Sequence, residues 1–136
     1  MPGAPLYLDT SAVLRAILEA GTTPEIEARI AAAPVLLTSR LSLVEGSRAL
    51  LRLRSLGVVP SQRIVDAARD LERLWQRCDI WELTRSVCEL AAEVAPEHRL
   101  RTLDALHLAT FTLARRRIAG LELLTSDERL RAAATL

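Results

Sequence analysis

Aromatic side chains are scarce in this chain of 136 residues, which contains only Tyr7, Trp75, Trp81 and Phe111. Hydrophobic residues nevertheless make up 50% of the sequence, so a core would have to consist mainly of Leu, Val, Ile and Ala. Such a core suits helices packed on a small sheet. The length suits a single domain over residues 1–136.

Membrane-spanning and secretory segments are also lacking. No apolar run is long enough to cross a bilayer, and segment 1–5 has no basic residues before an apolar stretch. Cys78 and Cys88 are too widely spaced for a CxxC pair, and with two histidines in the chain a zinc site is not expected. We therefore expect a cytoplasmic protein with two free thiols and no membrane partner.

Lysine is absent: all 18 basic residues are arginine, and they nearly balance 17 acidic residues. Arginine binds phosphate groups well, which makes Arg15, Arg48 and Arg115 candidates for contacts with a nucleic acid. The same usage equally indicates a compositional bias of the source. Charge alone therefore does not identify a partner.

Apolar runs alternate with helical segments along the whole chain. Strands are expected over 6–8, 35–38, 79–83 and 121–124, with the third at an edge of the sheet. Helices are expected over 12–20, 25–33, 41–56, 62–77, 85–95, 103–117 and 126–134. This alternation predicts an α/β fold, in which a short parallel sheet of four or five strands is sandwiched between helices.

Four acidic residues follow apolar runs or lie early in predicted helices, namely Asp9, Glu45, Asp104 and Asp127. A carboxylate beside a core is costly unless its charge is compensated. In open parallel sheets ligands bind beyond the carboxyl ends of the strands, where Asp9 and Asp127 are expected to meet. Converging carboxylates would hold a hard cation such as Mg²⁺ or Mn²⁺. The pattern therefore predicts metal-dependent hydrolysis of phosphodiester bonds.

The first two acids also have structural interpretations. Asp9 could form an Asx turn beside a helix cap provided by Thr10 or Ser11. Glu45 could pair with an arginine on the same helix surface, an interaction that contributes little stability.

The last two acids have structural interpretations as well. Asp104 follows the predicted cap Thr102, where an acid interacts favourably with the helix dipole. Asp127 lies inside a capping-box pattern formed by Thr125 and Glu128. Each acid is thus ambiguous when taken alone, and their shared position beside apolar runs is what favours a common site.

The four acidic segments together resemble the PIN-domain ribonucleases, in particular the VapC toxins of bacterial toxin–antitoxin pairs. The segments are 8–12 (LDTSA), 42–45 (SLVE), 104–109 (DALHLA) and 124–130 (LTSDERL). Each motif is weak alone, whereas the ordered set, which covers nearly the whole chain, is specific.

The resemblance implies a PIN-like nuclease domain in which Asp9, Glu45, Asp104 and Asp127 bind one or two Mg²⁺ or Mn²⁺ ions and carry the reaction. It further implies that the substrate is RNA, that a small cognate antitoxin blocks the acidic site, and that the protein forms a homodimer.

Polar residues beside the acids have expected supporting roles. By the resemblance, Thr10 or Ser11 would add a hydroxyl contact near the metal or a bound water. His107 follows Asp104 by one helical turn and is expected to be a hydrogen-bonding group in the core rather than a metal ligand.

Two other functions are compatible with the sequence. One is a PIN-type nuclease that acts in RNA processing or on DNA without an antitoxin. The other is a non-catalytic α/β protein-interaction module whose acids are caps and ion pairs. No Ser-His-Asp or Cys-His set indicates nucleophilic catalysis by a side chain.

Overall fold

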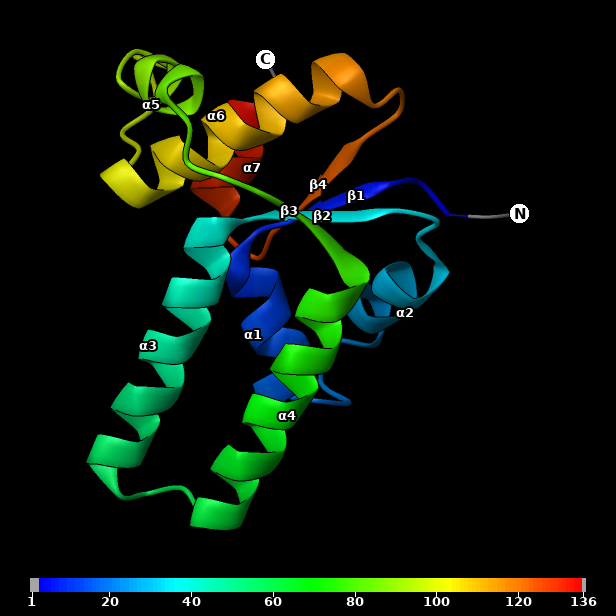
Figure 1. Ribbon diagram of the computed structural model, residues 1–136, viewed down its shortest axis with the longest axis vertical. Helices are drawn as coiled ribbons and strands as arrows, with labels where there is room; N and C mark the ends of the chain where they lie inside the picture. Colours follow the sequence, from blue (N-terminus) through cyan, green and yellow to red (C-terminus); the bar gives the residue numbers. More distant parts are fainter. Residues whose placement is uncertain (1–2, 136) are drawn as a thin grey trace.

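The computed structural model describes residues 3–135, in which seven helices alternate with four strands (Figure 1). The strands are β1 (Leu6–Leu8), β2 (Leu36–Ser39), β3 (Cys78–Trp81) and β4 (Glu122–Leu124). The helices are α1 (Thr10–Leu18), α2 (Pro24–Ala32), α3 (Arg40–Leu56), α4 (Ser61–Arg77), α5 (Arg85–Ala91), α6 (Thr102–Arg117) and α7 (Glu128–Ala134). Each element expected from the apolar periodicity is present.

The strands form one parallel sheet in the order β3-β2-β1-β4. β1 pairs on both sides, so that Leu6 lies opposite Leu36 of β2 and Glu122 of β4. The chain runs outward from β1 through β2 to β3 and then returns to the other side of β1 as β4. The predicted α/β fold is confirmed, as is the edge position of β3. The strand order therefore reverses between β1 and β4, because β2 and β3 extend the sheet on one side of β1 and β4 lies on the other. Open α/β sheets bind ligands at such a point.

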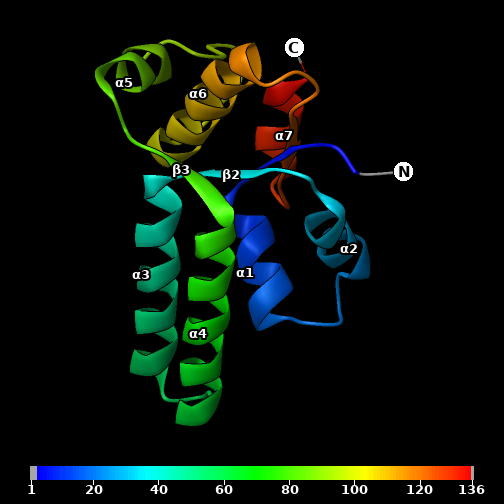
Figure 2. The same cartoon turned by 45° about the vertical axis from the view of Figure 1, so that its right-hand side comes forward.

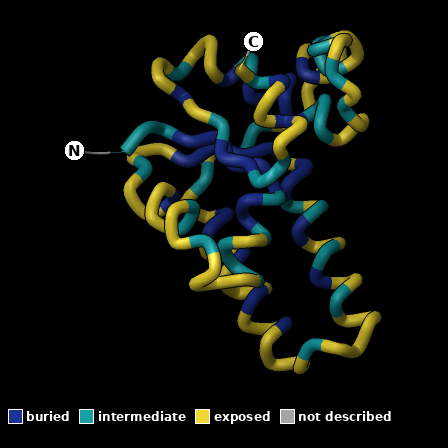
Figure 3. Tube along the Cα trace, turned by 180° about the vertical axis from the view of Figure 1, so that it is seen from behind, coloured by how far each residue is buried: buried dark blue, intermediate teal, exposed yellow. Residues whose placement is uncertain are grey.

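Helices cover both faces of the sheet. In Figures 1 and 2, α1 to α4 lie against one face and α5, α6 and α7 lie against the other. Successive side chains of a strand point to opposite faces, so Leu6 and Leu8 pack with α1 and α4 while Tyr7 packs with α6 and α7. All three are buried, and Figure 3 shows the buried strands β1 and β2 in dark blue at the centre of the molecule.

Several helix ends differ from the prediction, most of them by one or two residues. α5 ends about one turn early, because Ala95 has a φ of +47° and precedes Pro96, which disfavours helical backbone in the residue before it. α6 begins at Thr102 itself, with Arg101 at the N-cap position and no side-chain cap. Asp104 therefore lies in the first turn of α6, as the sequence indicated.

Cys78 and Cys88 are free, as predicted. Cys78 is half-buried in the edge strand β3, whereas Cys88 is exposed on α5. No helix within residues 3–135 combines the length and the apolarity that crossing a membrane requires.

We expect Leu8→Ala to destabilise the protein by about 2–5 kcal/mol, because it removes a fully buried side chain from the central strand and leaves a cavity. Urea unfolding measures the loss. Leu51→Ala, at an exposed position of α3, is the matched control and should change stability by about 0.5 kcal/mol or less. Equal effects of the two substitutions would contradict the central place of β1 in the core.

Candidate active site

The four candidate acids line one open cleft of ≈ 500 Å³ at the carboxyl end of the sheet. Asp9 directly follows β1, and Asp127 follows β4. Glu45 lies in α3, which follows β2, and Asp104 lies in the first turn of α6. The fold thus brings together four residues from distant parts of the chain, at the point where the strand order reverses.

Asp9 is nearly buried, with 5% of its surface exposed, and hydrogen bonds from hydroxyl groups stabilise its negative charge. Its Oδ2 accepts hydrogen bonds from the hydroxyls of Ser11 at 2.6 Å and Thr125 at 2.7 Å. Its Oδ1 lies 3.6 Å from Nε2 of His107. The expectation that Thr10 or Ser11 caps α1 is wrong, because Asp9 itself occupies the N-cap position and both hydroxyls bind carboxylates instead.

Glu45 is held by two contacts on one oxygen. Its Oε1 accepts a hydrogen bond from the Thr10 hydroxyl at 2.7 Å and lies 2.6 Å from Nε2 of His107. Within residues 3–135 Glu45 contacts His107 and Thr10 and forms no ion pair with an arginine, so the interpretation of Glu45 as part of a surface pair with an arginine is wrong. Burial raises the pKa of Glu45, but the hydrogen bonds from His107 and Thr10 together bring the pKa below its usual value.

Asp127 caps α7. Its Oδ1 accepts hydrogen bonds from the backbone N–H groups of Arg129 at 2.8 Å and Leu130 at 3.3 Å. The predicted capping box is wrong in its register, because Asp127 rather than Thr125 takes the N-cap position. Thr125 instead accepts a hydrogen bond from the backbone N–H of Asp127 at 3.0 Å and donates its own proton to Asp9. Asp127 therefore combines a capping role with a place in the wall of the cleft.

Three of the four carboxylates share one arrangement. In Asp9, Glu45 and Asp127, one oxygen has two polar partners, whereas no hydrogen bond from residues 3–135 reaches the other oxygen. Two contacts on one oxygen restrain the rotation of the carboxylate. The second oxygen keeps its lone pairs available to a ligand in the cleft.

Asp104 is the acid with the least favourable surroundings. Burial raises its pKa above the usual value, and the negative charges of Asp127 and Asp9 raise it further, against the smaller opposing effect of His107. Carboxylates that share this cleft therefore repel one another in the absence of a cation.

The donor atoms fit a hard cation, although they do not form a closed ligand shell. Within residues 3–135, no group of three or more His, Cys, Asp or Glu side chains is arranged closely enough to hold a metal ion. The cleft nevertheless presents carboxylate and hydroxyl oxygens and no thiol among its lining residues, which is the chemistry that Mg²⁺ and Mn²⁺ prefer. A divalent cation would also offset the repulsion that, together with burial, raises the pKa of Asp104.

His107 is buried with 1% of its surface exposed, and it forms hydrogen bonds in the core as expected. Its Nδ1 lies 2.8 Å from the Tyr7 hydroxyl. Neither Tyr7 nor Thr125 was predicted as part of the site. The available signal was their position, because each stands two residues before a candidate acid in or beside a strand.

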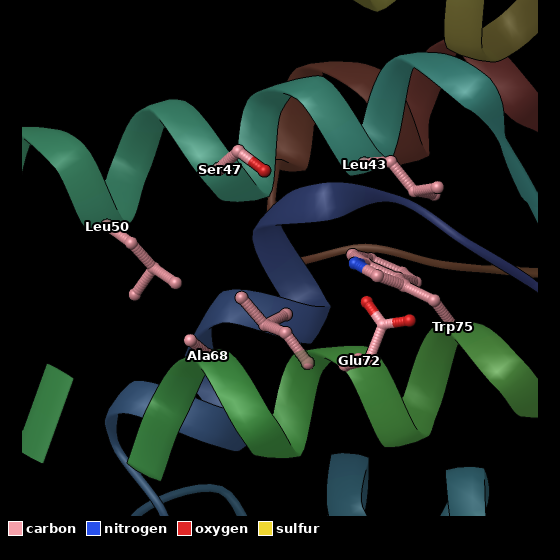
Figure 4. A pocket seen from close by; sticks show the side chains of 7 residues that line it. Leu43, Ser47, Leu50, Ala68, Glu72 and Trp75 are labelled. Carbon is pink, nitrogen blue, oxygen red and sulfur yellow. The ribbon is translucent and has the colours of Figure 1, made fainter. Parts of the chain in front are cut away.

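A separate hollow of ≈ 280 Å³ lies between α3 and α4. Figure 4 shows mainly apolar side chains of the two helices facing one another across it. Its lining residues are Leu43, Ser47, Leu50, Ala68, Leu71, Glu72 and Trp75. With a single carboxylate among these seven residues, this hollow does not offer the donors of a metal site.

Comparison with known proteins defines the class of this fold and cleft. The PIN domain family matches residues 6–136. Ribonuclease VapC45 of Mycobacterium tuberculosis is 32% identical over 110 residues, which cover 77% of this chain and 73% of that protein. The structure of VapC20 from Mycobacterium tuberculosis, described as a sarcin-ricin loop cleaving toxin, matches with a TM-score of 0.67 and 22% identity over 94% of both chains. A toxin–antitoxin complex from Klebsiella pneumoniae matches with a TM-score of 0.61 and 21% identity, over 90% of this chain and 86% of that chain.

The chain belongs to the PIN-domain family of nucleases. Both solved structures are below 25% identity, and they support the fold. Within the family the chain is of the VapC ribonuclease type, which is the group that its four acidic motifs indicated.

We expect Asp104→Asn to stabilise the metal-free protein at neutral pH by about 0.5 kcal/mol, the scale of interactions between partly exposed charges. Because the folded-state pKa of Asp104 is raised, folding favours its protonated form, and this contribution is lost as the pH rises through that pKa. The advantage of the variant should therefore be present at neutral pH and disappear in acid.

Thermal unfolding in excess chelator at several pH values measures this difference. Asp70→Asn, at an exposed position of α4, is the control and should give no pH-dependent gain. A loss of stability in Asp104→Asn at neutral pH would contradict repulsion among the four acids.

Proposed function

We propose that this protein is a metal-dependent endoribonuclease toxin that hydrolyses RNA phosphodiester bonds and is neutralised by a small cognate antitoxin. The observation that carries the proposal is the convergence of Asp9, Glu45, Asp104 and Asp127 on one cleft. Membership of the VapC ribonuclease type supports the same activity.

The four acids would hold Mg²⁺ or Mn²⁺. Asp9, Glu45 and Asp127 would each offer the oxygen that the protein leaves without a hydrogen bond, and Asp104 would complete the negative charge of the site. When bound, such an ion lowers the pKa of water and stabilises negative charge on a phosphate.

A cysteine nucleophile is a poor alternative in this chain. Burial raises the pKa of the Cys78 thiol to about 12, so the reactive thiolate is rare at neutral pH. Neither Cys78 nor Cys88 lines the acidic cleft. Hydrolysis by water therefore agrees better with the surroundings of the cleft than covalent catalysis does.

Two arginines among the residues that line the cleft are suited to bind an RNA backbone. Arg48 and Arg52 line the cleft beside Glu45, one helical turn apart on α3, and no ion pair within residues 3–135 occupies them. Arginine forks bind phosphate oxygens. Of the other candidate contacts, Arg15 pairs with Glu19 and Arg115 lies 5.0 Å above the ring of Phe111. These contacts favour Arg48 over the other two predicted arginines.

Relatives support the wider assignment of substrate and partner. VapC20 is described as cleaving the sarcin-ricin loop, and the Klebsiella pneumoniae structure is a complex of a toxin with an antitoxin. We extend both properties to this chain, with RNA as the substrate, an antitoxin that covers the acidic cleft and a homodimer as the assembly. The cytoplasm, where RNA and an antitoxin would both be present, is the expected compartment.

We expect Asp9→Asn to reduce Mn²⁺-dependent cleavage of RNA by more than about 100-fold. Residues that only support a metal ligand already cost 10–100-fold when replaced. The fold should survive, because the side-chain oxygen of Asn can accept the hydrogen bonds from Ser11 and Thr125. Calorimetric titration with Mn²⁺ and gel analysis of RNA cleavage measure the two effects, with Asp70→Asn as the control.

The outcomes separate the competing functions. Full cleavage in excess chelator, or unchanged Mn²⁺ binding in Asp9→Asn, would overturn the metal site. Metal binding and cleavage without growth arrest on expression, together with no antitoxin gene beside this gene, would favour an RNA-processing nuclease. Absence of both metal binding and cleavage would favour a protein-interaction module.

We expect Arg48→Ala and Arg52→Ala to raise the KM for RNA while leaving Mn²⁺ affinity unchanged, because each removes a cation that binds phosphate and no metal-binding oxygen. The slope of log KM against log salt should fall by about 0.7 for each arginine removed. Arg15→Ala is the matched control, since Arg15 pairs with Glu19 and does not line the cleft. An unchanged KM in both cleft variants would contradict this role.

A further inference from the structure

A buried chain of polar contacts links the centre of the sheet to the acidic cleft. The Tyr7 hydroxyl of β1 lies 2.8 Å from Nδ1 of His107 in α6, and Nε2 of His107 lies 2.6 Å from Oε1 of Glu45 in α3. Tyr7 is 0% exposed and His107 is 1% exposed. Of these three residues, Glu45 is the one that lines the cleft.

The positions of the protons along these contacts follow from the contact with Glu45. A carboxylate oxygen can only accept a hydrogen bond, so Nε2 of His107, 2.6 Å from Oε1, carries a proton and donates it to Glu45. In the neutral imidazole Nδ1 is then the acceptor, and the Tyr7 hydroxyl donates to it.

This arrangement determines which oxygen of Glu45 is available. Nε2 of His107 and the hydroxyl of Thr10 both contact Oε1, so Oε2 is the oxygen left for the cleft. A glutamate side chain has several rotatable bonds, and ordering it costs free energy unless neighbouring groups hold it beforehand. The contacts from within the core supply that order before any ligand arrives.

We propose that Tyr7 and His107 are positioning residues, which hold the Glu45 carboxylate with one oxygen directed to a divalent cation in the cleft. This inference rests on the proposed function, because it assigns a role toward the metal that the four acids would bind. Neither residue contacts the cation in this scheme. Both act through Glu45.

The alternative is a purely structural role, in which His107 serves only to satisfy the buried Tyr7 hydroxyl. Two uncharged substitutions at position 107 separate these roles. The amide of Gln reaches the position of Nε2 and can donate to Glu45, whereas the amide of Asn reaches the position of Nδ1 and can accept from Tyr7. Each variant thus preserves one of the two hydrogen bonds and removes the other.

Calorimetric titration with Mn²⁺ tests the proposal. We expect His107→Asn to bind Mn²⁺ at least about 10-fold more weakly than the wild type, the usual cost of losing a group behind a metal ligand. His107→Gln should retain most of the affinity. Thermal unfolding of both variants accompanies the titration, because removal of the hydrogen bond to Tyr7 should make His107→Gln the less stable of the two. Equal Mn²⁺ affinities, or weaker binding by Gln than by Asn, would overturn the positioning role.

A second set of measurements needs no substitution at position 107. Nitrogen NMR of the histidine side chains should show His107 as the Nε2–H tautomer in the wild type. Tyr7→Phe, which keeps the ring and removes the hydroxyl, should lower the population of that tautomer and weaken Mn²⁺ binding. Thr112→Val, which removes a hydroxyl that donates to Leu108 on the same helix as His107, should do neither. An Nδ1–H tautomer in the wild type would overturn the proposal.

Different results would overturn the proposed function and the positioning role of Tyr7 and His107. A wild type that binds no Mn²⁺ would overturn both the proposed function and this inference. Mn²⁺ binding that is lost in Asp9→Asn but unchanged in His107→Asn and Tyr7→Phe would leave the proposed function intact and overturn only the positioning role.

Discussion

The parallel pairing of β1 on both of its sides is the interaction on which the rest of the structure depends. β1 has only three residues, yet it joins β2 to β4 and contributes side chains to both layers of the core. Its last residue is followed at once by Asp9, so the position of that carboxylate relative to β4 is determined by the register of the sheet. A shift of this register would displace Asp9 from Thr125, to which it is hydrogen bonded.

The cost of gathering negative charge beside a core explains the polar groups around the cleft. Burial of a carboxylate is unfavourable unless hydrogen-bond donors approach it. Ser11 and Thr125 supply them to Asp9, Thr10 and His107 contact Glu45, and the first turn of α7 supplies backbone N–H groups to Asp127. Asp104 lacks comparable compensation, and its pKa is raised by burial and by repulsion from Asp127 and Asp9. The site is thus stabilised in three of its acids and left unfavourable in the fourth.

Much of the fold could be predicted because the responsible interactions are local. Continuous apolar runs at 6–8 and 121–124 predict buried strands, and turn residues between them predict the helices. The errors lie at helix ends, because single hydrogen bonds decide which residue begins or ends a helix. Thr125 fits a capping box by sequence, but its hydroxyl binds Asp9, and Asp127 takes the cap. Such competition between nearby partners has no signature in the spacing of residues.

The sequence by itself determined the alternation of strands and helices and the identity of the four acids, because hydrophobic periodicity and residue chemistry are properties of short segments. Only the tertiary structure decided that these acids share one cleft, that His107 contacts Glu45 rather than solvent, and which carboxylate oxygens stay free. These features depend on contacts between residues far apart in the chain, such as Thr125 with Asp9 at a separation of 116 residues and Tyr7 with His107 at 100. Their geometry follows from the strand order β3-β2-β1-β4, which no local pattern specifies.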